Sequence, residues 1–213
     1  MSDVRRLAKK DLAEAAEVAV RAFEYDPFFR HCFGGSDERY LRQLRTAFHM
    51  LYGASLQRGG SLFAAHSEGA LLGVVALEGP GRPLSWGELM RSPQLFRQLV
   101  MLALVGGPGA LARLDGWDRA VRTLRPPEPH FYVLGLGVLP EFQGKGYGRA
   151  LMERLHQEAD AHPYAIGVGL DTDTDKNLSF YGQLGYEPTG TVDIGGFDMH
   201  CMFRSNGRLS HGR

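Results

Sequence analysis

A strand, a glycine-rich turn and a helix are predicted in succession between residues 131 and 159, and they constrain how the rest of the chain can fold. Residues 131–138 are an apolar run of β type, and residues 143–148 read Gln-Gly-Lys-Gly-Tyr-Gly. Apolar side chains then recur at helical spacing at Leu151, Met152, Leu155 and Ala159. Glycines at alternate positions lack Cβ atoms, so several backbone N–H groups can converge in front of the helix. Such a turn is typical of an anion site, above all for phosphate.

The spacing of the turn argues against two common nucleotide sites. A nucleoside-triphosphate loop requires Ser or Thr after Gly-Lys, but Lys145 is followed by Gly146. A dinucleotide fingerprint requires Gly-x-Gly-x-x-Gly, whereas the glycines here are spaced two and two. A purely structural connection between strand and helix remains open, because glycine-rich turns are common.

Two motifs in order carry a resemblance to a known family. Gln143, Gly146 and Gly148 fill the pattern Gln/Arg-x-x-Gly-x-Gly/Ala, so this segment resembles the acetyl-CoA pyrophosphate loop of the GNAT N-acetyltransferase superfamily. Residues 129–148 look most like puromycin N-acetyltransferase-like proteins, and residues 170–186 are similar to the second cofactor segment of those proteins. The resemblance is tight between these two motifs and looser over the N-terminal third.

The resemblance implies an α+β fold, an α/β/α sandwich whose mixed, mostly antiparallel sheet is splayed at the acetyl-CoA site. The length and composition favour a single domain over residues 1–204, with a polar, flexible tail over 205–213. Helical patterns between residues 79 and 129 are longer than a crossover requires, which predicts a helical insertion at about 84–125. By the resemblance, this insertion would cover part of the acceptor site.

Periodicity predicts the other elements. Strands are expected over residues 4–7, 61–65, 71–77 and 164–170, and a hairpin through 193–196 should join a strand from 186 to one over 197–204. Helices are expected from residue 11 to about 26, over 38–56 and over 177–184. The aromatic stretch 28–33 is expected to be a connection.

Composition excludes several classes of partner. Lys+Arg and Asp+Glu both number 24, so the net charge is zero and we expect neither a nucleic acid nor a membrane as a partner. The N-terminus lacks the apolar region of a signal peptide, and the longest aliphatic run, 99–105, is far shorter than the roughly 20 residues of a membrane span. We expect a cytoplasmic protein, as monomer or homodimer, in which Cys32 and Cys201 are buried thiols.

The resemblance implies acetyl-CoA as the acyl donor. Its pyrophosphate would meet the backbone N–H groups of the turn, and its pantetheine arm would add like a strand to residues 136–138. The residues expected to bind it are Leu136, Gly137, Val138, Gln143, Gly144, Lys145, Gly146, Tyr147, Gly148, Arg149, Asn177 and Tyr181. For Asn177 a helix N-cap role remains equally open. No metal is expected, because Lys176 and Gly182 occupy positions where a calcium loop starting at Asp171 needs Gly and Glu.

Acetyl transfer to an amine requires a general acid for the thiolate and a route for the amine proton. Tyr181 shares a helix face with Asn177, and the resemblance implies a tyrosine hydroxyl near the sulfur, so Tyr181 is the predicted acid. A core tyrosine is the alternative. Several superfamily members carry a glutamate eleven residues before the first fixed residue of the loop. In this sequence that position is occupied by Tyr132. His130 shares a strand face with Tyr132 and is the predicted base, with Glu128 in reserve; a structural role for His130 and a water relay remain open.

The acceptor site is predicted from aromatic residues. The resemblance places the loop after the first helix beside the acceptor amine, which implies roles for Phe23, Tyr25, Phe28, Phe29 and Tyr132. A satellite core cluster is the alternative. Trp86 and Trp117 are possible lining residues of the insertion, although core packing is favoured for both because tryptophan is usually well buried.

These expectations converge on one leading function. It is transfer of acetyl from acetyl-CoA to a primary amine of a small molecule by direct attack in a ternary complex, since neither cysteine lies in a motif that activates a nucleophile. Acetylation of a protein N-terminus or lysine is the second hypothesis. A non-catalytic CoA-binding sensor is the third, motivated by the missing strand glutamate.

Overall fold

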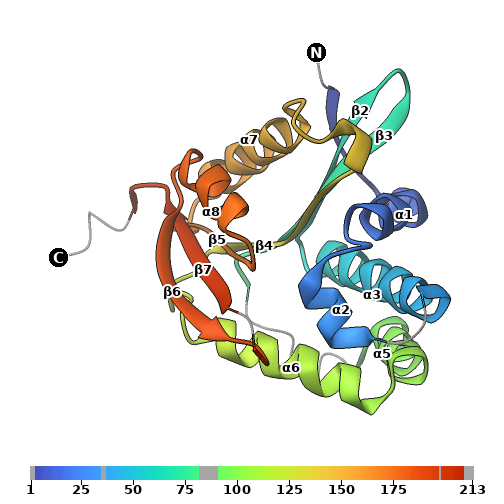
Figure 1. Cartoon of the computed structure of the whole chain (residues 1–213). Helices are drawn as coiled ribbons and strands as arrows, with labels where there is room; N and C mark the ends of the chain where they lie inside the picture. Colours follow the sequence, from blue (N-terminus) through green and yellow to red (C-terminus); the bar gives the residue numbers. More distant parts are fainter. Residues whose placement is uncertain (1–2, 35–36, 82–90, 197, 209–213) are drawn as a thin grey trace.

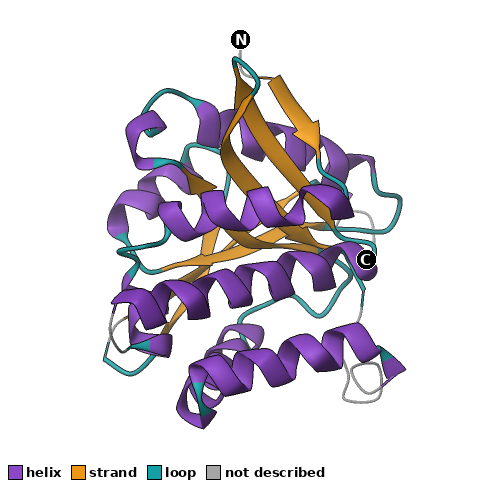
Figure 2. Ribbon diagram, turned by 90° about the vertical axis from the view of Figure 1, so that its right-hand side faces the viewer, coloured by secondary structure: helices purple, strands orange, loops and turns teal. Residues whose placement is uncertain are grey.

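The computed structural model describes residues 3–34, 37–81, 91–196 and 198–208. Seven strands form one twisted sheet with helices layered against it (Figures 1 and 2). The strands lie in the order β1-β2-β3-β4-β5-β7-β6. Their bounds are β1 Asp3–Arg6, β2 Ser61–Ser67, β3 Ala70–Glu78, β4 Phe131–Val138, β5 Gly167–Thr172, β6 Glu187–Asp193 and β7 Asp198–Ser205. The predicted mixed, mostly antiparallel sheet is confirmed, because every neighbouring pair except β4 and β5 is antiparallel.

The parallel pair β4 and β5 separates almost as soon as it forms. Its pairing covers Phe131 with Val168 and Tyr132 with Gly169. On its other edge, β4 pairs with β3 as far as Val138. Residues 133–138 therefore have one edge paired with β3 and the other facing the gap that opens towards β5.

Two layers of helices cover the sheet. Their bounds are α1 Leu12–Ala22, α2 Pro27–Phe33, α3 Asp37–Gln57, α5 Pro93–Gly106, α6 Pro108–Arg122, α7 Tyr147–Ala161 and α8 Asp175–Gly182. Helices α1 and α3 lie on one face of β2, β3 and β4, and α7 lies on the other (Figure 1). Alternate residues of β3 enter the two cores, with Val74 and Ala76 on the α1 side and Val75 and Leu77 on the α7 side. This period of two is what a strand buried on both faces requires.

Helix α2 corrects one prediction, since residues 28–33 were expected to be a connection. The Asp26 carboxylate accepts the Phe29 N–H at 3.0 Å, and Pro27 occupies the first turn. An acidic N-cap followed by proline is a favourable helix start. The short helix therefore begins at Pro27 and directs Phe28, Phe29 and Phe33 inwards or along the cavity described below.

Helices α5 and α6 lie within the predicted insertion. Helix α6 runs beside α2 and past the ends of β6 and β7 (Figure 1). Trp86 lies outside the described residues. In the part of the chain that the structure describes, no single helix has the length and apolar composition to span a membrane; Leu99–Gly106 and Gly109–Arg122 reach both only as a pair bent by 119°.

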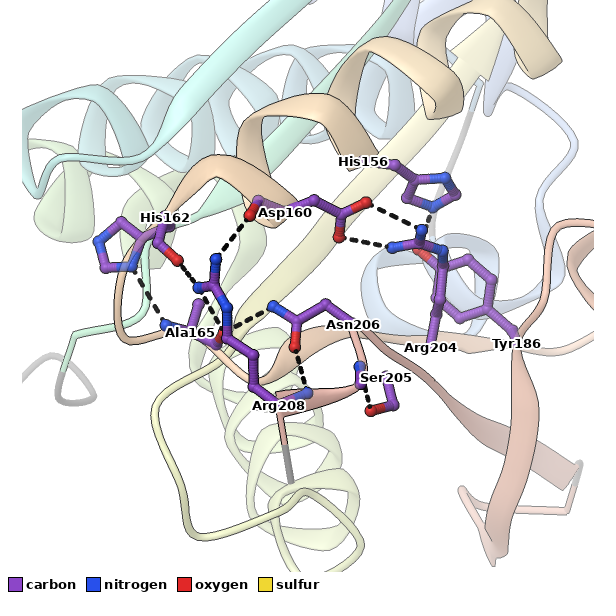
Figure 3. A network of polar contacts seen from close by, with 10 residues as sticks. His156, Asp160, His162, Ala165, Tyr186, Arg204, Ser205, Asn206 and Arg208 are labelled. Atoms are coloured by element: carbon purple, nitrogen blue, oxygen red, sulfur yellow. Dashed lines mark hydrogen bonds and ion pairs between the residues drawn. The ribbon is translucent and has the colours of Figure 1, made fainter. Parts of the chain in front are cut away.

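The C-terminal residues are bonded to the end of α7 (Figure 3). Arg204 makes two hydrogen bonds of 2.9 Å to the Asp160 carboxylate, and Asn206 donates to the Ala165 carbonyl at 2.7 Å. Arg208 donates to the carbonyls of Asp160 and His162. The predicted end of the domain at residue 204 lies within this network. Strand β7 continues to Ser205, and Asn206 and Arg208 then bond to residues at and just after the end of α7.

Candidate active site

The glycine turn and the open edge of β4 form one wall of a cavity that we call the loop groove. Its volume is about 720 Å³. The opposite wall is made by the end of α1, the segment after it and α8. The lining includes Arg21, Tyr25, Leu136, Gly137, Val138, Phe142, Gln143, Gly144, Gly146, Gly148, Arg149, Lys176, Asn177, Phe180 and Tyr181. Most of the residues predicted to bind acetyl-CoA therefore line a single groove.

The turn is built for backbone access at the start of α7. Gly144 and Gly146 have φ angles of 73° and 89°, which glycine adopts without strain, and an added Cβ would meet no atom within 4 Å at either position. The side chain of Gln143 donates to the Val138 carbonyl at 3.1 Å and ties the turn to β4. The first-turn N–H groups of α7 lack partners within the helix, so they and the helix dipole favour an anion there.

A second cavity lies deeper in the molecule, and we call it the aromatic cavity. Its volume is about 250 Å³. Helices α2, α3 and α6 and strands β4 and β5 supply its walls. The lining includes Phe23, Asp26, Phe28, Phe29, Phe48, Met50, Leu51, Leu114, Trp117, Leu134, Gly135, Leu136, Leu170, Asp171, Thr172, Asp173, Asn177, Tyr181 and Met199.

Five of the described residues line both cavities, and we call the place where they lie the junction. The shared residues are Phe23, Asp26, Leu136, Asn177 and Tyr181. The predicted acid, Tyr181, is therefore one of the residues that border both cavities.

Asp26 is the carboxylate at this junction, and sequence reasoning missed it as a functional residue. Tyr40 holds the preceding turn by donating its hydroxyl to the Phe23 carbonyl at 3.0 Å. Burial raises the pKa of Asp26 to about 7, and the nearby Asp173 and Asp171 add to that rise, whereas the N–H groups of Phe29 and Phe28 oppose it. The sequence signal was only that of a helix cap, Asp-Pro, because nothing local shows that the cap faces a cavity.

Asp171 is held on the far wall by two donors. The Tyr132 hydroxyl donates to one carboxylate oxygen at 2.5 Å, and the Trp117 indole N–H donates to the other at 3.0 Å. The guanidinium of Arg125 lies over the Tyr132 ring, 3.2 Å from its centroid. Burial nevertheless raises the pKa of Asp171 above its usual value, more than those hydrogen bonds and Arg125 lower it. Tyr132, the position where a strand glutamate was sought, thus orients a carboxylate of the neighbouring strand.

Tyr181 and Asn177 lie on one face of α8, as predicted. Tyr181 is buried, and burial raises the pKa of its hydroxyl well above the usual value. Asn177 donates to the Thr172 hydroxyl at 3.0 Å. Its alternative N-cap role is wrong, because α8 begins at Asp175 with Thr174 as the N-cap.

The predicted bases lie away from the junction. His130 packs against Tyr132 and Phe203, with ring centroids 6.5 and 5.8 Å away, and one of its ring nitrogens lies 2.8 Å from the Glu128 carbonyl. Burial lowers the pKa of His130 below its usual value. Neither His130 nor Glu128 belongs to the described lining of the two cavities, and Glu128 is exposed. The geometry favours Asp26 over both.

The other predicted residues divide between the cavities. Phe23, Phe28 and Phe29 line the aromatic cavity, whereas Tyr25 lines the loop groove and is 78% exposed. Trp117 packs against the hydrophobic core, as favoured from the sequence, and its ring also lines the aromatic cavity, with its centroid 5.0 Å from that of Phe28. Lys145, predicted to bind acetyl-CoA, is not among the described residues that line the loop groove, and its ammonium group lies over the Phe142 ring. Tyr147 is also outside it and packs against both cores.

Residues 109–188 match the family model of the acetyltransferase (GNAT) domain. That range contains β4, the glycine turn, α7, β5 and α8. The sheet order, the separation of β4 from β5 and this match identify the GNAT fold.

Solved structures share this fold over nearly the whole chain. A crystal structure of a histone acetyltransferase HPA2 and related acetyltransferase from Corynebacterium glutamicum has a TM-score of 0.69 at 21% identity and covers 96% of each chain. A PaiA N-acetyltransferase from Thermoplasma acidophilum in complex with coenzyme A has a TM-score of 0.59 at 14% identity, covering 96% of this chain and 99% of its own. YncA from Salmonella typhimurium, a putative acetyltransferase with its cofactor acetyl-CoA, has a TM-score of 0.56 at 18% identity, covering 96% and 94%.

Proposed function

We propose that this protein is an acetyl-CoA-dependent N-acetyltransferase that transfers acetyl directly to a primary amine of a small molecule. The observation that carries the proposal is the junction of the loop groove with the aromatic cavity at Tyr181. The junction supports direct attack in a ternary complex. Both free cysteines are buried, and burial raises the pKa of Cys32 to about 12 and that of Cys201 to about 11, which argues against a thiolate nucleophile.

The residues of the loop groove fit acetyl-CoA. The N–H groups at the start of α7 would hold the pyrophosphate, with Arg149 adding positive charge beside them. The unpaired edge of β4 at Leu136, Gly137 and Val138 would bond the amide groups of the pantetheine arm as a neighbouring strand does. Bound there, acetyl-CoA supplies an acetyl thioester.

Tyr181 is suited to donate a proton to the departing sulfur. Its raised pKa keeps the hydroxyl protonated at neutral pH. Asn177, one helical turn earlier, presents an amide to the same junction and is positioned by Thr172. In this interpretation, α8 supplies both the acid and a polar contact to the pantetheine arm.

The shape of the acceptor cavity supports a small molecule. The aromatic cavity is lined on several sides by α2, α3, α6 and the sheet. A protein N-terminus or lysine would need an open groove for its flanking residues, so this alternative is less well supported. We also propose that the chain is related to puromycin N-acetyltransferase-like proteins. Such a relationship does not identify the amine that this protein acetylates.

The test is acetyl-CoA turnover, followed by thiol release, against a panel of small amines that includes aminonucleosides and polyamines. Tyr181→Phe should lower kcat by about a hundredfold or more, because a general acid typically contributes that much, and should leave acetyl-CoA binding unchanged. Tyr164→Phe is the matched control, since Tyr164 is 77% exposed and lies outside both described linings.

Two outcomes would contradict the proposal. Tight acetyl-CoA binding without turnover on any amine or peptide would favour the non-catalytic sensor. Turnover that is equal in Tyr181→Phe and the parent would remove Tyr181 as the acid.

A further inference from the structure

We propose that the aromatic cavity binds its acceptor as an apolar ammonium ion, a primary amine on an aromatic or branched-alkyl body, and that Asp26 takes the proton from its nitrogen. The inference rests on the proposed function and names the substrate class of the same site. It combines the chemistry of the cavity walls, the charge enclosed in the cavity and the position of Asp26.

The walls fit an apolar body. Phe29 makes edge contacts with both Phe28 and Phe48, with ring centroids 5.2 and 5.1 Å apart. Trp117 and Leu114 close the cavity from α6. Aromatic rings bind apolar groups, and their faces attract a cation.

The cavity also holds negative charge that its own lining does not balance. Asp26, Asp171 and Asp173 line it, and within the described residues no Lys, Arg or His does. Behind the wall, Arg125 interacts with Asp171 but also lies 3.7 Å from Glu78. Buried carboxylates without cations favour a cationic ligand over a neutral or anionic one of equal shape.

Asp173 supplies an independent sign of a missing partner. Its Oδ2 atom is buried and has no hydrogen-bond partner among the described residues. A buried carboxylate oxygen without a donor is costly, so such atoms usually face a ligand or water. An ammonium group in the cavity would satisfy it.

Asp26 is placed to act on that ammonium at the reacting end. Of the residues shared by the two cavities, it is the one with a carboxylate. Its Oδ1 atom accepts the Phe29 N–H, which fixes the carboxylate at the start of α2. The titratable groups that interact with it are Asp171 and Asp173 from β5 and the loop after it, Tyr40 from α3 and Cys32 from α2. A carboxylate whose pKa is raised to about 7 can accept a proton at neutral pH and release it again.

The proton and bond changes balance. Asp26 takes one proton from the ammonium, and the neutral amine then forms the N–C bond as the C–S bond breaks. Tyr181 donates its proton to the sulfur and recovers one from the acylated nitrogen. Asp26 finally releases its proton to solvent, so each turnover yields amide, thiol and one proton.

Calorimetry in the presence of CoA tests the binding part without requiring turnover. The probes are 2-phenylethylamine and 3-methylbutylamine, their alcohols as neutral matches, and phenylalanine as an amine with an added carboxylate. The amines should bind at least about tenfold more tightly than the other probes, because among these probes only they form a charged hydrogen bond without adding a second negative charge to the cavity. Asp173→Asn should reduce that preference about tenfold, whereas Asp175→Asn, an equal charge change at an exposed position outside the lining, should not.

The pH profile tests Asp26. In the parent, kcat for a bound amine should rise through about pH 7, and Asp26→Asn should abolish that rise and lower kcat by about a hundredfold. Asparagine retains the N-cap, so folding is preserved. A rise that persists in Asp26→Asn would overturn the role of Asp26, and alcohols that bind as well as amines would overturn the substrate class. Absence of turnover together with the predicted binding preference would contradict the proposed reaction and not the cavity's ligand class.

Discussion

The glycines of β4 have different physical roles although they lie two residues apart. An added Cβ at Gly137 would lie 2.9 Å from the Ala22 Cβ and 3.0 Å from the Phe23 ring, closer than such contacts allow. At Gly135 the nearest atoms, on Phe23 and Phe48, would be 3.8 and 3.9 Å away. Gly137 therefore permits the close approach of α1 to β4, whereas Gly135 leaves space that belongs to the aromatic cavity.

We expect Gly137→Ala to lower the free energy of unfolding by about 1–3 kcal/mol, because overpacking a rigid contact costs that much. Gly135→Ala on the same strand is the control and should change stability by less than about 1 kcal/mol. Urea unfolding followed by circular dichroism measures both. Equal effects of the two substitutions would show that the approach of α1 does not depend on Gly137.

The missing strand glutamate is explained by a different arrangement of carboxylates. Tyr132 occupies that position and donates to Asp171 on β5. Asp26, from the segment between α1 and α2, lies at the junction instead. The carboxylate at the junction therefore comes from a segment that is distant from β4 in the sequence.

Helix α6 supplies one wall of the aromatic cavity. Arg113 fastens it to α2 by donating twice to the Cys32 carbonyl, at 2.9 and 2.6 Å. Leu114 and Trp117, on the following turn, then face the cavity. We therefore expect the position of this helix to affect the proposed acceptor site, because its residues line the aromatic cavity and, among the described lining, not the loop groove.

Replacing Arg113 by Met should therefore raise KM for the acceptor by roughly five- to tenfold and leave KM for acetyl-CoA unchanged, because hydrogen bonds from a charged group contribute roughly 1.5 kcal/mol or more. Arg119→Met on the same helix is the control, since Arg119 pairs at the surface with Asp115 and surface pairs contribute little. Initial rates with each substrate varied in turn give both constants. A matching rise for acetyl-CoA would mean that α6 supports the whole site.

At the scale of the whole molecule, the core beside α7 contains a histidine that must stay neutral. His156 is buried and its Nε2 atom lies 3.0 Å from the Tyr186 hydroxyl (Figure 3). Burial lowers the pKa of His156 to about 4, with Arg204 adding to that effect and Asp160 opposing it. The unfolded chain, with a histidine pKa of about 6.5, binds the proton more readily than the folded protein does.

Stability should consequently fall as the pH falls from about 6.5 to about 4, with a contribution from His156 of up to roughly 1.4 kcal/mol per pH unit. His156→Gln should flatten the dependence in that window. His49→Gln, on α3 outside both described cavities, should leave it unchanged. Urea titrations at pH 4.5, 5.5 and 7 measure the slope, and an unaltered slope in His156→Gln would assign acid unfolding to other groups.

Local patterns alone determined the strand, the glycine turn and the helix, and with them the prediction of an anion site. These features depend on residues close in sequence: β-type apolar residues, glycines at the turn and helical spacing after it. The pairing of Asn177 with Tyr181 on one helix face was predictable for the same reason. The resemblance then supplied the mixed, mostly antiparallel character of the sheet, which periodicity does not contain.

Only the tertiary structure decided which side chains line the aromatic cavity. Asp26, Trp117 and Asp171 come from distant segments, and each has an ordinary local role as a cap, a packed indole or a strand residue. Their common cavity exists because β5 leaves β4 after Tyr132 and because α2 and α6 close the space between them. Burial and long-range charge, which raise the pKa of Asp26, depend on that packing and are absent from any local pattern.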